Sequence, residues 1–249
     1  MIRLVRAEFG KLTTTRWMWW LLVGYLAYAG FNMVLLILLA GQQGVPPLTD
    51  PDELRTVLAS TISAVVFPLV VGVVLLTTEY RNRTIATSFL VTPRRGRVVT
   101  AKVVVGFVVG LLFGVVGVAF TLAVTAPLLA YKDVSVHWAG DPLDILGGCV
   151  VVATLYTVLG VGLGALIRNQ VAAVLVAVLG SLLVDSLVAQ FLPEVGRYWP
   201  AGAAGSLTQG IPSRGVDFLP PWGGALVLIG WAVALAVVGT FTAVRRDVT

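Results

Sequence analysis

The sequence is poor in the residues that build disulfide frameworks, metal centres and charged surfaces. Its 249 residues include one cysteine, Cys149, and one histidine, His137. A single cysteine excludes a disulfide within the chain and any multi-cysteine metal site, and a single histidine excludes a His-rich metal site. The sequence also has no Walker A motif, so it does not provide a P-loop for the phosphates of ATP.

Charge is scarce as well. Charged residues make up 12% of the chain, whereas soluble domains carry about 25%. Apolar residues make up 58%, and the mean hydropathy is +0.95. A chain this apolar cannot cover itself with a polar surface in water, and lipid removes that requirement. The composition therefore predicts an integral membrane protein.

The few charges divide the chain into long uncharged stretches. A helix needs roughly 20 residues to cross the hydrocarbon core of a bilayer. Each uncharged or nearly uncharged stretch reaches this length, so we predict an all-α polytopic membrane protein with six transmembrane helices. The predicted spans are near 17–40, 56–78, 103–131, 144–167, 171–192 and 222–244.

The basic residues set the orientation. Lys and Arg accumulate in the cytoplasmic loops of membrane proteins. All but four of the 17 Lys and Arg residues fall on one side of the predicted spans, the exceptions being Arg55, Lys132, Arg197 and Arg214. This distribution predicts that both termini are cytoplasmic. The net charge of +5 is then a signal of topology, and we do not expect nucleic-acid binding.

The N-terminal segment 1–16 is amphipathic. Ile2, Val5, Phe9 and Leu12 recur at helical spacing and form one apolar face. We favour a cytoplasmic interfacial helix that lies in the headgroup plane, followed by a permease domain over 17–249. The alternative is an ordinary basic flank that only sets the topology.

A second amphipathic segment follows the second span, at residues 79–90. Its apolar residues share one helical arc and its polar residues the other, and Pro93 ends the pattern. The segment is either a short cytoplasmic helix that docks a partner or a basic loop that lies on anionic lipid. The residue pattern alone leaves both interpretations open.

Several short motifs, in this order along the chain, resemble type-2 ABC exporter permeases, chiefly the actinobacterial members. The motifs are Arg6-Ala7-Glu8-Phe9-Gly10-Lys11-Leu12, Thr14-Thr15-Arg16, Glu79-Tyr80-Arg81 with Thr84, Thr92-Pro93-Arg94-Arg95, Ala101-Lys102, Leu166-Ile167-Arg168-Asn169-Gln170 and Arg245-Arg246-Asp247. Each is weak alone, and the loop between the second and third spans is the most specific.

The resemblance implies a permease subunit that pairs with a second permease copy or a paralogue and with two cytoplasmic ABC ATPase subunits. ATP would then bind to the partner subunit, and this chain would hold no cofactor, metal or catalytic site of its own. The resemblance also implies that the segment 79–90 is a coupling helix that touches the ATPase. The expected coupling residues are Glu79, Tyr80, Arg81, Thr84, Thr87 and Ser88.

Two features inside the spans are candidate functional positions. Gly106, Gly110 and Gly114 in the third span, and Gly160 and Gly164 in the fourth, repeat at four-residue spacing. Such spacing allows close helix approach, and we favour packing within the chain over a dimer seam. Asp185 is the one ionisable residue within a predicted span. We favour a hydrated or paired structural role for it, and a role in the transport pathway is the alternative.

We therefore expect the permease subunit of an ATP-binding cassette exporter in the bacterial plasma membrane, without enzymatic activity of its own, that moves a small or amphipathic substrate out of the cell. An ion-coupled secondary carrier usually needs several intramembrane ionisable groups, and only Asp185 is available here. A non-transporting membrane scaffold or immunity protein is the remaining alternative. The loop 193–221 is expected either to dip partly into the membrane or to be an ordinary surface loop.

Overall fold

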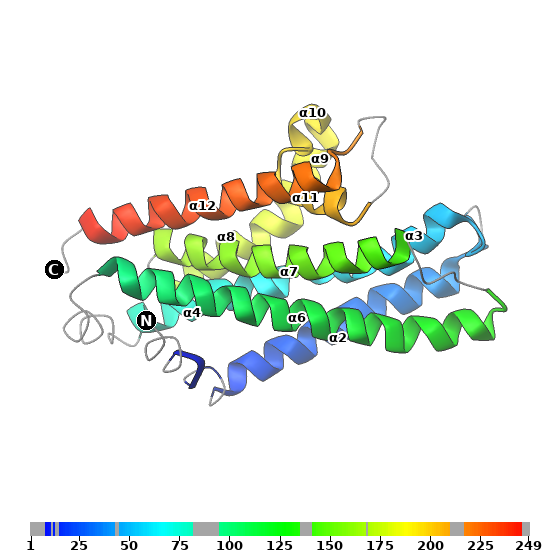
Figure 1. Cartoon of the computed structure of the whole chain (residues 1–249), viewed down its shortest axis with the longest axis horizontal. Helices are drawn as coiled ribbons and strands as arrows, with labels where there is room; N and C mark the ends of the chain where they lie inside the picture. Colours follow the sequence, from blue (N-terminus) through cyan, green and yellow to red (C-terminus); the bar gives the residue numbers. More distant parts are fainter. Residues whose placement is uncertain are drawn as a thin grey trace.

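The protein is a bundle of long helices (Figure 1). The computed structural model describes residues 8–10, 12, 15–42, 45–81, 95–134, 141–167, 169–209 and 217–245. Within these ranges all regular elements are helical, and six helical segments are long and apolar enough to cross a membrane. The predicted all-α class and the predicted number of six spanning helices are confirmed.

The first three spans occupy the N-terminal half of the chain. Their elements are α2 (Arg16–Leu39), then α3 (Pro51–Ala59), η1 (Ser60–Ala64) and α4 (Val66–Arg81), then α6 (Arg95–Tyr131). The second span starts earlier than the predicted residue 56, because Asp50 caps α3 by accepting a hydrogen bond from the Asp52 N–H at 2.9 Å.

The second span also contains a break that the uncharged stretch did not reveal. Residues Ser60–Ala64 form a 3₁₀ turn, in which the Val65 N–H donates to the Ile62 carbonyl at 3.1 Å. Pro68 explains the break, because it has no N–H with which to bond the Ala64 carbonyl. Proline is tolerated at this place because it falls in the first turn of α4.

The C-terminal half supplies the other three spans and a folded connection. Its elements are α7 (Asp141–Leu166), then α8 (Gln170–Leu179), the π-helical turn η2 (Gly180–Val184) and α9 (Asp185–Phe191), then the short α10 (Pro193–Gly196) and α11 (Pro200–Leu207), and finally α12 (Pro221–Arg245). The predicted loop 193–221 thus contains two helices. Ala203–Leu207 of α11 are buried, and α11 packs against α7 and α12.

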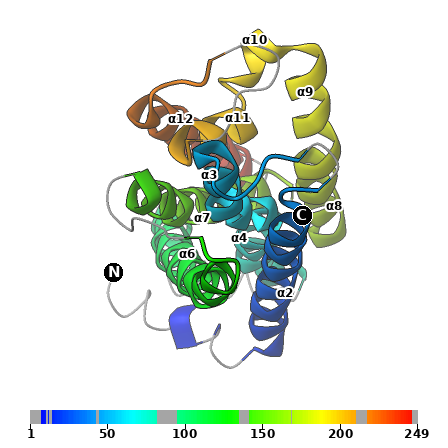
Figure 2. The ribbon, with the colours of Figure 1, turned by 90° about the vertical axis from the view of Figure 1, so that its right-hand side faces the viewer.

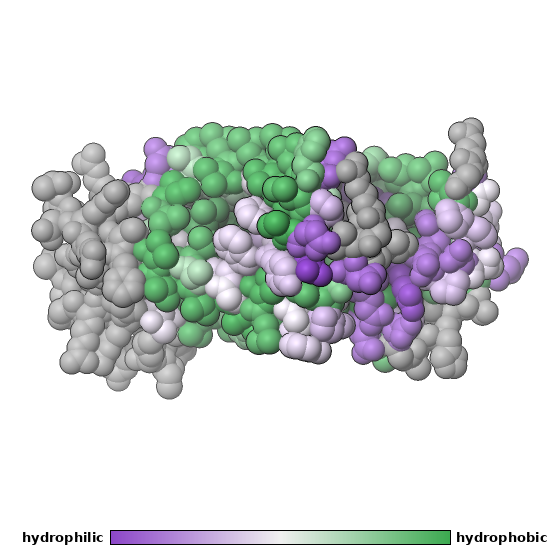
Figure 3. Space-filling model, turned by 90° about the horizontal axis from the view of Figure 1, so that it is seen from above, coloured by the Kyte–Doolittle hydropathy of each residue, from purple (hydrophilic) through white to green (hydrophobic). Residues whose placement is uncertain are grey.

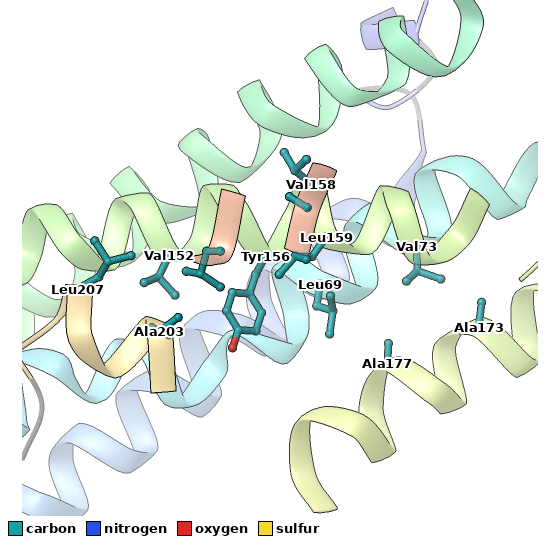
Figure 4. Packing of buried hydrophobic residues seen from close by; sticks show 13 residues of the cluster. Leu69, Val73, Val152, Tyr156, Val158, Leu159, Ala173, Ala177, Ala203 and Leu207 are labelled. Atoms are coloured by element: carbon teal, nitrogen blue, oxygen red, sulfur yellow. The ribbon is translucent and has the colours of Figure 1, made fainter. Parts of the chain in front are cut away.

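The core is built around α7, which packs against α4, α6 and α12. Figure 4 shows part of this core, where Tyr156 and Leu159 of α7 lie near Leu69 of α4 and Val152 of α7 lies near Ala203 of α11. The fifth span, α8 to α9, lies along one side of the bundle next to α4 (Figure 2). It is the least buried of the six candidate spans.

The bundle has two chemically different ends. We call "base" the end at which α2, α6 and α8 begin and α4, α7 and α12 end, and "distal end" the opposite one (Figure 1). Seen from above, the surface between the ends is a wide hydrophobic band, and hydrophilic residues gather toward the distal end, where α3 lies (Figure 3). This pattern fits a bundle whose middle is covered by lipid.

Candidate functional site

The base brings together segments that the sequence separates. Glu79, Tyr80 and Arg81 form the last turn of α4, so they continue the second span and do not start a separate helix. Arg81 is exposed there. Three of the expected coupling residues, Thr84, Thr87 and Ser88, lie outside the described residues.

A buried ion pair ties the base together. Lys102 of α6 is 1% exposed, and its Nζ donates to Glu8 Oε2 at 2.8 Å and to the Leu75 carbonyl at 3.1 Å. A charge removed from water is costly unless it is paired and hydrogen-bonded. These two bonds therefore join the segment before α2 to α4 and α6 at one point.

Apolar contacts support the same junction. Leu12 is buried and Phe9 is partly buried, and both belong to the cluster that contains Tyr25, Val71 and Val105. Thr15 Oγ1 donates to the Leu12 carbonyl at 2.8 Å. The described part of the N-terminal segment thus packs on the bundle, while most of the predicted interfacial helix, residues 1–7 included, lies outside the described residues.

Sequence reasoning did not identify the Glu8–Lys102 pair. A signal was present, because Lys102 stands at the boundary of a long uncharged stretch and Glu8 directly precedes Phe9 of the apolar face. The two residues are 94 positions apart, however, and spacing alone does not pair residues at that distance.

A second candidate site is a cavity on the side of the bundle, between its two ends; we call it the lateral cavity. Its volume is about 510 Å³, and it lies between α4, α7, the α8–α9 span and α12. This volume falls within the range of roughly 300–1,000 Å³ that is usual for ligand sites. The lining is almost entirely apolar, with Leu69, Leu159, Val176 and Leu235 among its residues.

Asp185 supplies the carboxylate of this cavity. It follows directly after η2, where its backbone N–H bonds to the Gly180 carbonyl, five residues back. Such π-type turns inside α-helices occur frequently at functional sites. Trp199 Nε1 donates to Asp185 Oδ1 at 2.6 Å, so the fold of α10 and α11 brings an indole to the carboxylate.

Three aromatic residues line the same cavity as this carboxylate. The rings of Trp199 and Trp231 meet edge to face with centroids 5.3 Å apart, and both residues line the cavity. Tyr156 lines it from α7, and in Figure 4 its hydroxyl points away from α7, with Ala203 on one side and Ala177 on the other. The sequence singled out Asp185 but none of these three aromatic residues as partners.

The repeated glycines lie at helix contacts within the chain. Gly106, Gly110 and Gly114 of α6 face residues of α7, and a Cβ on Gly110 would come within 2.7 Å of the Thr154 Cα. Gly160 and Gly164 of α7 instead face the backbone of α4. These close approaches explain why small residues occur at that spacing.

The described part of the chain contains no candidate metal site, because no three His, Cys, Asp or Glu side chains come together there. Cys149 is buried in a cluster with Leu58, Ala59 and Ile145. Its thiol thus serves as a small apolar side chain in the core.

Comparison with known protein families gives a match over most of the chain. The family described as ABC-2 family transporter protein matches residues 4–184. The match includes the Glu8–Lys102 junction, the Glu79–Arg81 turn and the first turns of the fifth span. A search among curated proteins finds no match.

Proposed function

The chain belongs to the ABC-2 transporter family, and we propose that it is the permease subunit of an exporter driven by a separate ATPase subunit. Family membership supports a membrane transport component that works with ATPase subunits. Export of a small or amphipathic substrate, and ATP hydrolysis by the partner, are the parts that we propose for this chain.

The observation that carries this proposal is the junction at the base. The chain leaves α4 at Arg81 and enters α6 at Arg95. Lys102 bonds the Leu75 carbonyl close to the end of α4, so α4 and α6 are linked on the bundle side of this connection. A partner that presses on the connection would act on both spans together. Glu79, Tyr80, Arg81, Thr84, Thr87 and Ser88 are the proposed contact residues.

Co-purification tests this assignment. An ABC ATPase encoded beside this chain should bind it in detergent, and Arg81→Glu combined with Thr87→Glu should weaken the complex at least about tenfold, since charge reversal at an interface costs well over 1 kcal/mol. Asp144→Arg is the matched control, because Asp144 is exposed at the distal end. Equal retention of the ATPase by both variants would contradict the proposed coupling surface.

We also propose that a second permease domain, a copy of this chain or a paralogue, covers the fifth span. Support comes from its exposed apolar side chains, which include Leu175, Leu182 and Leu187. Leu175→Cys in a Cys149→Ala background should then form cross-linked dimers in membranes. Phe31→Cys in the same background is the control, because Phe31 is exposed on α2. Equal cross-linking of both variants would contradict a specific contact at the fifth span.

An ATP-driven exporter and an ion-coupled carrier differ in the energy source that drives transport. Vesicles that contain the permease and its ATPase should accumulate substrate only when ATP is present on the ATPase side. A carrier would respond to an ion gradient without the ATPase. Uptake driven by a proton or sodium gradient in the absence of the ATPase would refute the exporter assignment.

The location that we propose is the bacterial plasma membrane, with the base on the cytoplasmic side. The support is the clustering of Lys and Arg in the segments next to the base. A thiol reagent that does not cross membranes should therefore fail to label a cysteine added after Thr249 in intact cells. Efficient labelling there would reverse the orientation.

A further inference from the structure

The lateral cavity combines an apolar body with a single acidic group. Leu69, Leu159, Leu163 and Leu235 supply side chains from three helices, and Asp185 is the one charged residue in its lining. An apolar cavity with a few convergent polar groups is the usual form of a small-molecule site. The charge of Asp185 therefore decides which ligand the cavity favours.

Asp185 makes no ion pair within the described part of the chain. Among the described residues, its carboxylate accepts one hydrogen bond, from the Trp199 indole at 2.6 Å, which is a neutral donor. Arg197 borders a smaller cavity on another side of Asp185, but its Nη2 forms an ion pair with Glu194 Oε2 at 3.3 Å. The carboxylate is partly buried, and a carboxylate away from bulk water is stabilised by a cation.

Tyr156 supplies a second polar group to the cavity. Its side chain is 2% exposed and lines the cavity, and in Figure 4 its hydroxyl points away from α7. A tyrosine hydroxyl can both donate and accept a hydrogen bond, so it is able to bind a polar group of a ligand. Asp185 and Tyr156 also line a second, adjoining cavity together, so both groups are near the same space.

Aromatic rings complete the environment. Trp199 and Trp231 both line the cavity, and Trp231 is held in place by donating its Nε1 hydrogen to the Tyr198 carbonyl at 3.0 Å. A cation over the face of such a ring gains about 0.5–2 kcal/mol, with the larger values in sites shielded from water.

We propose that this cavity binds a hydrophobic organic amine in its protonated form. The ammonium group donates to the Asp185 carboxylate and to the Tyr156 hydroxyl and lies beside the indole rings. The apolar body of the amine lies along the leucine side chains. As a statement about the exported cargo this rests on the proposed function, whereas amine binding is a property of the permease alone.

Three probes that share a phenylbutyl chain and differ in their terminal group test the proposal. They are phenylbutylammonium, phenylbutanol and phenylbutanoate, which are cationic, neutral and anionic at neutral pH. Binding to the purified full-length permease in lipid nanodiscs is measured by equilibrium dialysis, with empty nanodiscs as the blank for partition into lipid. The cation should bind at least about tenfold more tightly than the alcohol, and the anion should bind most weakly.

Substitutions then test which side chains cause the preference for the cation. Asp185→Asn keeps an acceptor for Trp199 and should remove the preference for the cation over the alcohol, while Tyr156→Phe should weaken cation binding about threefold. Asp144→Asn is the control, because Asp144 is an exposed carboxylate on the same helix as Tyr156, and it should leave all three affinities unchanged.

The proposal is wrong if the unsubstituted permease does not prefer the cation, or if Asp185→Asn keeps that preference. The first of these measurements uses no variant, so it stands even if a substitution prevents folding. Retention of the ATPase by the permease is measured separately. Failure of amine binding with a stable ATPase complex would refute this inference alone, and failure of the complex would refute the proposed function alone.

Discussion

Removing one partner of the Glu8–Lys102 pair should destabilise the protein far more than removing a partner of a surface pair. The Lys102 and Glu8 side chains are 1% and 10% exposed, and their charged atoms are 2.8 Å apart. Lys102→Met leaves the Glu8 carboxylate buried without this countercharge. Breaking a buried pair in this way costs about 3–5 kcal/mol.

A matched control is available at the distal end. Arg55 Nη2 lies 2.6 Å from Asp141 Oδ2, but these side chains are 36% and 59% exposed. Water screens such a pair, so Arg55→Met should cost at most about 1 kcal/mol. Lys102→Met and Arg55→Met each replace a long basic side chain by methionine. The chief difference is that the remaining carboxylate is buried at Glu8 and exposed at Asp141.

A double-mutant cycle separates the pair from the rest of each side chain. Glu8→Leu combined with Lys102→Met removes both charges, so it should cost clearly less than the sum of the two single substitutions. The free energy of unfolding is measured by titrating SDS into mixed micelles and following tryptophan fluorescence. If Lys102→Met costs no more than Arg55→Met, or if the two single effects simply add, the ion pair does not hold the base together.

Three further substitutions test particular contacts by the same unfolding measurement. Gly160→Val should cost about 1–3 kcal/mol, because a side chain there would meet the Leu69 carbonyl of α4, whereas Gly147→Val has open space and should be nearly neutral. Asn169→Ala should cost about 1 kcal/mol, because the Asn169 side chain accepts from two N–H groups at the start of α8, and Asn169→Asp should retain that cap. Thr121→Val should cost about 0.6–1.7 kcal/mol, because it removes the hydroxyl that lies 2.6 Å from Thr61 Oγ1 between two spans; no loss would show that this contact is replaced elsewhere.

The spans could be predicted because lipid imposes a direct length requirement on uncharged sequence. The helix ends could not be predicted with the same precision. The helix α6 begins at Arg95, ahead of the predicted residue 103, because a helix continues wherever its backbone hydrogen bonds can form, even through charged residues. An uncharged stretch therefore marks the part of a helix that can lie in the hydrocarbon core. The helix itself can extend beyond that part.

Contacts between spans were the least predictable feature. A helix that is apolar on all sides has no distinct face, so the sequence of α2 or α7 does not tell which side is buried. The glycine spacing predicted close packing but not the partner, and the structure shows α6 and α4 on different sides of α7. Likewise, Asp185 was recognisable as unusual, but its bond to Trp199 depends on how α10 and α11 fold back.

The two candidate sites are connected through α4. Its Leu75 carbonyl is bonded by Lys102 at the base, and its Leu69 side chain lines the lateral cavity. These residues are less than two helical turns apart. Between them and the distal end, the 3₁₀ turn at Ser60–Ala64 interrupts the α-helical hydrogen bonding of the span and separates α4 from α3. A displacement of α4 by a partner at the base would therefore move a wall of the cavity directly.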